Sequence, residues 1–212
     1  MDLLLATRNV NKTREFAQIL GNRFRISDLL SLENGPKLEE TGRTFDENAI
    51  LKALAISGPR HLSQVKDQPV FVVADDSGLE VDALGGAPGI FSARYAGANA
   101  TDKQNIDKLL RELSCRNVPL DQRSARFRCV IALARDGKLL GTFEGAVDGT
   151  IIDHPRGDCG FGYDPIFLPD GSDRTFGEMA PQLKNQISHR AKAIAALREF
   201  LRRAELERAV RT

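Results

Sequence analysis

The sequence is short of cysteine, histidine and net charge, and each shortage argues against a class of protein. Its cysteines, Cys115, Cys129 and Cys159, are widely spaced and form no C-x-x-C pair, which argues against a disulfide scaffold and a zinc cluster. The histidines show no H-x-x-x-H spacing, so any metal should be held by carboxylates. The 30 basic and 29 acidic residues leave a net charge of +1, which argues against a nucleic-acid partner but still permits a local basic pocket for a phosphorylated small molecule.

Long apolar runs are also missing. No stretch approaches the roughly 18 uncharged apolar residues of a membrane span, and the first residues, "MDLLLATRN", lack the apolar core of a signal peptide. We therefore expect a cytoplasmic protein with no membrane partner. With 212 residues, 42% of them hydrophobic and 28% charged, the chain is long enough to bury one core, and we expect a single domain over residues 1–212.

Strands and helices are expected to alternate along the first half of the chain. The apolar run 3–6 predicts a strand, and the spacing of Phe16, Ile19 and Leu20 predicts a helix after a polar turn. The β-branched run 69–74 predicts a central strand that is buried on both faces.

Two capping-box patterns predict further helices. Thr44 and Glu47 begin the first, and Thr101 and Gln104 begin the second, over 101–113. The first of these helices places four apolar residues on one face, the face expected to pack on the rest of the protein: Ile50, Leu51, Leu54 and Ala55.

The second half of the chain predicts a β-hairpin and a long amphipathic helix. Asp136-Gly137 joins two apolar or alternating runs, a pair of residues that favours a type I′ turn. The helix begins at Ser188 and aligns four residues on one stripe: Ile194, Leu197, Leu201 and Ala204. The expected fold is α/β, with a mixed central β-sheet flanked by helices, in two lobes with an active-site cleft between them.

Polar and glycine-rich segments stand where the predicted elements end. Ligands gather at strand ends in open α/β sheets, so these segments are candidates for one common site. They are "TRNVNK" (7–12), "EETG" (39–42), "DDSG" (75–78), "PRGDCGFGYDP" (155–165) and "KNQISHR" (184–190).

The first polar segment lies just before a helix, where free backbone N–H groups favour an anion. Thr7, Asn9 and Lys12 suit a phosphate site. The alternative is that Asn9 or Asn11 only caps the helix and that Lys12 is solvated. Neither a P-loop nor a dinucleotide-binding glycine pattern is present in the sequence.

The "DDSG" segment sets two carboxylates, Asp75 and Asp76, at the end of the expected central strand. Buried carboxylates without a partner are costly, so the pair needs a cation, a helix N-terminus or water. Magnesium suits this need because it takes oxygen ligands from one or two carboxylates together with substrate phosphates. The alternative is a turn in which Asp76 is solvated.

The last two segments combine aromatic rings with donors. Phe161 and Tyr163 flank Gly162 in a glycine-rich loop that is suited to stack a base, unless both rings pack into the core. In "KNQISHR" the donors are Lys184, His189 and Arg190, suited to oxygens of a base or phosphate, or simply to solvent.

Five blocks, in this order, closely resemble the RdgB-like family of inosine/xanthosine triphosphate pyrophosphatases: "ATRNVNK", "EETGRTFDENAILKA", "ADDSGLEVDALGGAPGIFSARYAG", "PRGDCGFGYDPIF" and "ISHRAKA". The resemblance covers nearly the whole chain. It implies a homodimeric, magnesium-dependent enzyme that hydrolyses ITP, dITP and XTP to the monophosphate and pyrophosphate. Such an enzyme removes deaminated purines from the nucleotide pool.

The resemblance also implies roles for particular residues. Asp76 matches the catalytic proton acceptor, and Glu39 and Asp76 match the magnesium ligands. The implied substrate-binding residues are Thr7, Arg8, Asn9, Val10, Asn11, Lys12, Ser77, Phe161, Gly162, Tyr163, Asp164, Lys184, His189 and Arg190. Arg8 departs from the glycine found in many members, and this departure bears on the backbone conformation of the first segment.

Two other functions remain open from the residues. One is a module that binds a purine nucleotide without cleaving it, against which the presence of both Glu39 and Asp76 argues. The other is a pyrophosphatase that acts on other modified nucleotides.

Overall fold

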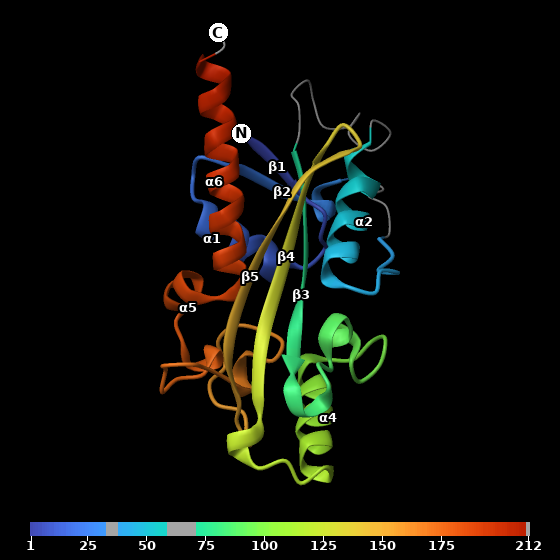
Figure 1. Ribbon diagram of the computed structural model, residues 1–212, viewed down its shortest axis with the longest axis vertical. Coiled ribbons are helices and arrows are strands. Elements are labelled where there is room, and N and C mark those ends of the chain that lie inside the picture. The colour runs from blue at the N-terminus through green and yellow to red at the C-terminus, as the bar shows by residue number, and fades with distance from the viewer. Residues whose placement is uncertain (33–37, 59–70, 211–212) are drawn as a thin grey trace. The chain divides into compact units, whose positions relative to one another are not determined.

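The computed structural model describes residues 1–32, 38–58 and 71–210, with side chains as far as Arg203 (Figure 1). The strands are β1 (Asp2–Leu5), β2 (Arg25–Asp28), β3 (Phe71–Val81), β4 (Ser124–Arg135), β5 (Lys138–Ile151) and β6 (Phe167–Pro169). The helices are α1 (Val10–Leu20), α2 (Phe45–Ser57), α4 (Asp102–Cys115), α5 (Pro181–Ile187) and α6 (His189–Val210).

The described strands form one mixed sheet in the order β2-β1-β3-β4-β5-β6. Strand β1 pairs in parallel with β2 and β3, whereas β5 and β6 pair antiparallel. The expected α/β fold with a mixed central sheet is therefore confirmed.

The chain divides into two compact units. Unit 1 comprises 1–76, 130–145 and 191–212, and unit 2 comprises 77–129 and 146–190. The boundaries fall inside β3, β4 and β5, so each of these strands contributes to both units. This division agrees with the two lobes expected from the sequence, while the cleft expected between them stays a prediction.

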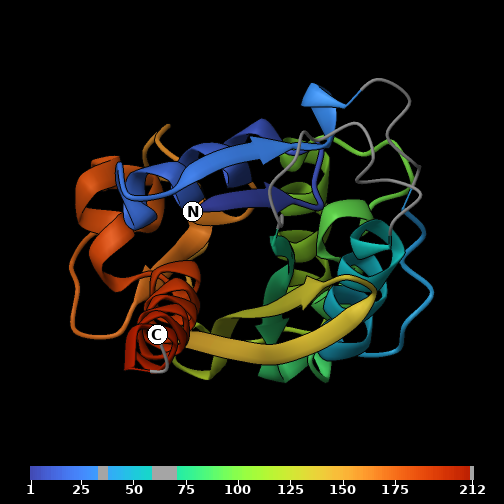
Figure 2. The same cartoon turned by 90° about the horizontal axis from the view of Figure 1, so that it is seen from above.

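In unit 1 both faces of the sheet are covered. Helices α1 and α6 lie on one face and α2 lies on the other (Figures 1 and 2). Residues 72–74 of β3 and 130–134 of β4 are consequently all fully buried, and their sequences are continuous apolar runs. The prediction of a central strand buried on both faces is confirmed for this part of β3.

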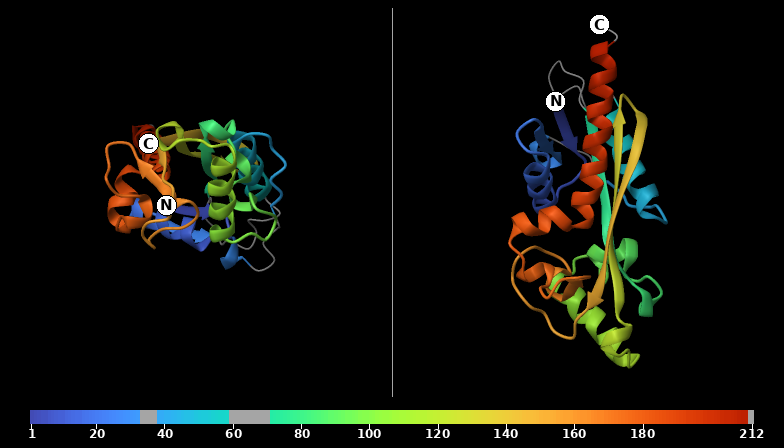
Figure 3. Two further views of the ribbon diagram at one scale, coloured as in Figure 1. Left: turned by 90° about the horizontal axis from the view of Figure 1, so that it is seen from below. Right: turned by 60° about the vertical axis from the view of Figure 1, so that its left-hand side comes forward.

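In unit 2 the side chains along a strand point alternately to a covered face and to an open face of the sheet. Ala125 and Phe127 of β4 join a core formed with α4 and with the segment 163–179 (Figure 3). The alternate residues Arg126 and Arg128 face the other side and form ion pairs with Asp148 and Glu80, respectively. A period of two therefore replaces continuous burial where β4 passes from one unit to the other.

Several local predictions are confirmed. Asp136 and Gly137 have φ values of 53° and 73°, as a type I′ hairpin turn between β4 and β5 requires. Thr101 and Gln104 form a complete capping box at α4. The stripe of α6 is buried at Ile194, Leu197 and Leu201, and the side chain of Ala204 lies outside the described residues.

Helix α2 packs on a face other than the expected one. Leu51 is 44% exposed, and the expected face of Ile50, Leu51, Leu54 and Ala55 was therefore wrong. The buried residues of α2 are Phe45, Asn48, Ala49, Lys52, Ala53, Ile56 and Ser57. Asn48 and Lys52 turn inward because α2 lies over the acidic part of β3. Ala49 and Ala53 are small and leave room for this close packing.

Among the described residues, no helix has the length and apolar character needed to cross a membrane.

Candidate active site

Asp75 and Asp76 lie inside strand β3, not after its end as the sequence suggested. Each is only 5% exposed, so the alternative of a solvated turn is wrong. Successive residues of a strand face opposite sides of the sheet. Accordingly, the Asp75 carboxylate pairs with Lys12 of α1, whereas Asp76 pairs with Lys52 of α2 on the opposite face.

Helix α2 holds the carboxylate of Asp76 at both oxygens. Lys52 Nζ donates to Oδ1 at 2.7 Å, and Asn48 Nδ2 donates to Oδ2 at 3.2 Å. The orientation of the Asn48 amide is fixed in turn, because its Oδ1 accepts a hydrogen bond from Gly42 N at 2.8 Å. A Cβ on Gly42 would lie 2.7 Å from the same Oδ1, so only glycine fits here without a shift.

Lys52 is a buried cation surrounded by oxygen atoms. Its Nζ also contacts the Glu40 carboxylate at 3.1 Å and the Asp75 carbonyl oxygen at 2.8 Å. Burial alone would lower the pKa of Lys52, but the charges of Asp76, Glu40 and Asp75 outweigh it and raise that pKa. Lys52 is therefore charged at neutral pH and partly compensates the carboxylates around it. We call Lys12, Glu40, Asn48, Lys52, Asp75 and Asp76 the carboxylate–lysine cluster.

The pKa of Asp76 is raised from its ordinary value. Burial is the main cause, and the positive charges of Lys52 and Lys12 oppose it. A raised pKa makes this carboxylate a better proton acceptor than a solvated aspartate.

The donor set of the cluster fits magnesium. No group of three or more His, Cys, Asp and Glu side chains close enough to ligate one ion occurs among the described residues. Magnesium does not require such a cage, because it commonly takes one or two carboxylates plus substrate phosphates and water. Asp76 and one of the adjacent residues Glu39 and Glu40 would be the carboxylate ligands, and magnesium binding itself stays a prediction. Glu39 is exposed, whereas Glu40 reaches Lys52, so the ligand role of Glu39 stays a prediction.

The first polar segment caps helix α1, as the alternative reading of the sequence expected. The Asn9 side chain accepts hydrogen bonds from Asn11 N and Lys12 N, at 3.0 and 3.3 Å. Lys12 is not simply solvated, because it pairs with Asp75. Arg8 is not among the described residues with positive φ, so arginine meets no backbone strain in the place where glycine is common. Phosphate binding by residues 7–12 stays a prediction.

In unit 2 the predicted donors surround Ser77 and Phe161. Arg190 is 1% exposed and donates to Ser77 Oγ at 2.8 Å. The Arg190 guanidinium lies 5.7 Å from the centre of the Phe161 ring, and Lys184 Nζ lies 4.8 Å from it. His189 stacks on Phe127, with ring centroids 4.7 Å apart. The structure thus brings Ser77, Phe161, Lys184 and Arg190 together within unit 2.

Asp164 and Lys184 form a buried ion pair that shapes the glycine-rich loop. Lys184 Nζ donates to Asp164 Oδ2 at 2.6 Å, and Phe161 N donates to the same oxygen at 2.8 Å. Gly160 has a φ of +77°, and a Cβ there would overlap the Asp164 carboxylate. The loop therefore has its conformation before any ligand binds.

The side chain of Tyr163 is not placed to stack on a base. It is 3% exposed, packs in the unit 2 core and donates from its hydroxyl to Ser92 O at 3.0 Å. The expectation that both rings stack on a base is therefore wrong for the ring of Tyr163. Any substrate contact of this residue would come from its backbone. Phe161, which is only partly buried, keeps the predicted role open.

Most loop N–H groups are already engaged. Phe161 N donates to Asp164, Gly162 N donates to Asp102 Oδ2 at 2.7 Å, and Asp164 N donates to Phe161 O. These three N–H groups are therefore not available to a ligand in this conformation of the loop.

The sequence reasoning missed Asn48 and Lys52. Both are buried polar residues four positions apart, which puts them on one face of α2. That spacing is visible in the sequence, but the apolar residues Ile50, Leu51 and Leu54 pointed to another face. The apolar residues Phe45, Ala49, Ala53 and Ile56 marked the true buried face.

Comparisons with known proteins identify the family to which the chain belongs. The sequence matches the model of the Ham1 family over residues 3–200, and the chain belongs to this family. A relative from Geobacillus kaustophilus named dITP/XTP pyrophosphatase is 49% identical over 93% of both chains. A relative of the same name from Bacillus licheniformis is 46% identical over 96% of this chain and 99% of its own.

Solved structures of the family have the same fold. A HAM1 protein from Coxiella burnetii superposes with a TM-score of 0.82 at 40% identity, covering 96% of this chain and 99% of that one. The Ham1 protein of Staphylococcus aureus gives a TM-score of 0.78 at 41% identity, covering 95% and 98%. The expected family and fold are both confirmed.

Replacing Lys52 by methionine tests whether this lysine stabilises the buried carboxylates. Lys52→Met leaves Asp76 and Glu40 without their shared cation, so we expect the free energy of unfolding to fall by about 3 kcal/mol. Urea unfolding measures it. The matched control is Lys103→Met, because Lys103 makes an exposed ion pair with Asp107 and its loss should cost less than about 0.5 kcal/mol. Equal stability of the two variants would contradict the role given to Lys52.

Proposed function

We propose that this protein hydrolyses dITP, XTP and ITP to the nucleoside monophosphate and pyrophosphate. Its place in the Ham1 family, and the name dITP/XTP pyrophosphatase carried by relatives up to 49% identical, support this activity. By removing deaminated purine nucleotides, such an activity keeps them out of newly made nucleic acid.

One observation carries the proposal. A carboxylate with a raised pKa, Asp76, lies in the middle of a buried strand and is paired with Lys52, which also contacts Glu40. A binding module gains nothing from burying this charge at such a cost, whereas a phosphate hydrolase needs both a proton acceptor and cations. The carboxylate–lysine cluster therefore favours catalysis over simple nucleotide binding.

Each residue of the cluster has a different role in the proposed hydrolysis. Asp76 accepts the proton of the water that attacks the α-phosphorus, and Asn48 and Lys52 keep its carboxylate in place. Lys12 offers positive charge to the triphosphate, whose negative charge shifts onto the departing pyrophosphate. Asp76 and Glu39 would hold magnesium, which would supply Lewis-acid stabilisation of that charge.

Residues of unit 2 suit recognition of the purine. Arg190 and Lys184 border the Phe161 ring, so a base stacked there meets cationic donors at its edge. Donors favour the 6-oxo group of hypoxanthine and xanthine, and they leave the 6-amino group of adenine unpaired.

A substrate panel tests the proposed activity. We expect ITP, dITP and XTP to be cleaved at least about 100-fold more efficiently than ATP or dUTP, because a mismatched buried edge costs several kcal/mol. Product analysis should show pyrophosphate and the monophosphate. Orthophosphate with the diphosphate would mean attack at the terminal phosphorus, and tight binding without turnover would mean a binding module.

The variant Asp76→Asn tests the proton acceptor. An amide keeps the shape of the side chain but is a poor base, so we expect turnover of XTP to fall by about 10²-fold or more. The protein should still fold but melt at a lower temperature, because buried Lys52 loses its nearest carboxylate, so turnover is compared where the variant is folded. Asp107→Asn, on the exposed side of α4, is the control and should change neither quantity. Near-normal turnover by a folded Asp76→Asn protein would remove this residue from the mechanism.

A comparison of Glu39→Gln with Glu40→Gln assigns the second metal ligand. We expect Glu39→Gln to raise the magnesium concentration for half-maximal activity by about tenfold or more. Glu40→Gln should change it less, because Glu40 pairs with Lys52. Measuring the activity of both variants as a function of magnesium concentration tests this assignment. A larger effect of Glu40→Gln than of Glu39→Gln would assign the ligand role to Glu40.

The assembly and location implied by the resemblance also remain proposals. We propose a homodimer that acts in the cytoplasm on a small-molecule substrate. Light scattering from the purified protein measures its mass against the 23.3 kDa of one chain.

A further inference from the structure

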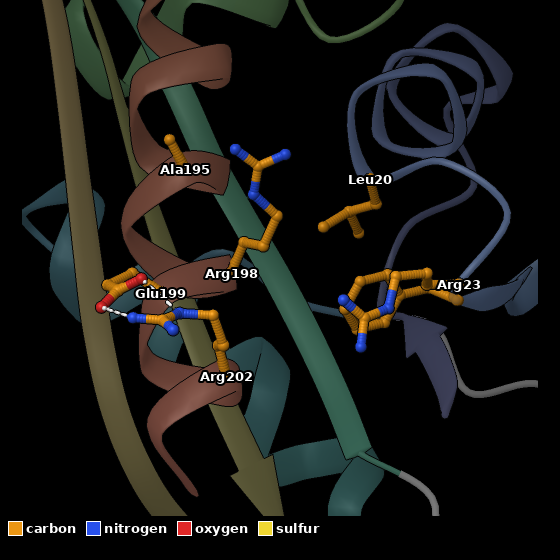
Figure 4. A pocket seen from close by; sticks show the side chains of 7 residues that line it. Leu20, Arg23, Ala195, Arg198, Glu199 and Arg202 are labelled. Carbon is orange, nitrogen blue, oxygen red and sulfur yellow. Dashed lines mark hydrogen bonds and ion pairs between the residues drawn. The ribbon is translucent and has the colours of Figure 1, made fainter. Parts of the chain in front are cut away.

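Unit 1 contains a cavity that none of the proposed catalytic residues lines. It has a volume of about 370 Å³ and lies between the C-terminal end of α1 and helix α6 (Figure 4). Its lining residues are Leu20, Arg23, Phe24, Ala195, Arg198, Glu199 and Arg202. This volume is in the range of sites that take small organic molecules.

The lining contains three arginines, Arg23, Arg198 and Arg202, and one glutamate, Glu199. Glu199 accepts two hydrogen bonds from Arg202, both at 3.0 Å, and one from Arg203 at 2.9 Å. This carboxylate is therefore occupied, and Figure 4 shows Arg202 turned along α6 toward it. Of the other two arginines of the lining, Arg23 and Arg198, the second is the one with no partner among the described residues.

Arg198 is directed at the cavity. In Figure 4 its guanidinium extends from α6 toward Leu20, and Arg23 lies on the far side of the gap. The Arg198 guanidinium makes no hydrogen bond or ion pair with any residue in the described part of the chain. A guanidinium presents N–H donors in a planar fork that matches phosphate oxygens.

We propose that this cavity binds the phosphate group of a small phosphate monoester. Arg198 and Arg23 hold the phosphate, and Leu20 and Phe24 contact the apolar or aromatic body of the molecule. A carboxylate ligand would find the same charge, but two arginines on opposite sides suit the tetrahedral, dianionic phosphate better than a planar monoanion.

Titration calorimetry with phenyl phosphate on the full chain tests this site. We expect Arg198→Gln to weaken binding by about tenfold or more, because one charge-assisted fork is lost. Arg111→Gln, an exposed arginine of α4, is the matched control and should bind as the wild type does. Inorganic phosphate should bind more weakly than phenyl phosphate and should also depend on Arg198.

Two outcomes would overturn the proposal. One is the absence of binding to the wild type at millimolar phenyl phosphate. The other is equal binding by Arg198→Gln and wild type, which would mean that the probe occupies a different site. XTP turnover by Arg198→Gln should be normal, so the outcome is independent of the proposed function.

A second observation concerns the loop around Gly162. The carboxylate of Asp102, in the first turn of α4, accepts a hydrogen bond from Gly162 N at 2.7 Å, across 60 residues of sequence. Gly162 has a φ of +63° and separates Phe161 from Tyr163. Tyr163 is fixed on one side by its bond to Ser92 O, and Phe161 on the other by its bond to Asp164.

The geometry assigns Asp102 the role of a positioning residue for the purine. This inference rests on the proposed function. Asp102 holds the Gly162 peptide, which orients the Phe161 ring between Lys184 and Arg190. Without this bond the peptide loses its charged acceptor, and the ring loses part of its fixed orientation.

Kinetics and amide exchange together test Asp102. We expect Asp102→Ala to raise the KM for XTP by about tenfold while kcat changes less than about threefold, because the residue acts on binding. Exchange at the Gly162 amide should become faster. Asp102→Asn keeps an oxygen acceptor and should restore the KM, and Asp107→Ala on the same helix is the control.

The two possible failures are distinguishable. Inactivity of the wild type toward XTP, dITP and ITP would refute the proposed function. Activity in the wild type with an unchanged KM in Asp102→Ala would refute the positioning role alone, and so would an Asp102→Asn protein as impaired as the alanine variant.

Discussion

The buried ion pair between Asp76 and Lys52 is the interaction on which the site in unit 1 depends. A carboxylate that is 5% exposed in the middle of a strand is tolerated only with a cation and a hydrogen-bond donor beside it. Helix α2 supplies both, and this requirement explains why its buried face carries Lys52 and Asn48. In the proposed function the same pair supplies a base and a positive charge.

Adjacent carboxylates acquire different roles because β3 is a strand. Its alternation sends Asp75 toward α1 and Asp76 toward α2, so each meets a different lysine. A turn would have left both side chains in solvent and equivalent to one another. Glycine contributes at Gly42 for a separate reason: it lets the chain approach Asn48 closely enough to orient the amide.

In unit 2, carboxylates likewise fix the glycine-rich loop. One carboxylate, Asp164, accepts from Lys184 and from Phe161 N, while Asp102 accepts from Gly162 N. The hydrogen bonds to these two carboxylates fix the conformation of the loop, and its two aromatic residues have different surroundings. Tyr163 packs in the core, and Phe161 is bordered by the cations Lys184 and Arg190.

The sequence by itself determined the elements whose signals are local. The hairpin turn at Asp136-Gly137, the capping box at Thr101 and the stripe of α6 follow from short-range chemistry, and long blocks of residues gave the family. Only the tertiary structure decided which face of α2 is buried, that Asp76 lies within a strand, and that Asp102 reaches Gly162. These depend on contacts between segments as many as 60 residues apart, which no local pattern encodes, because packing energy overrides local preference.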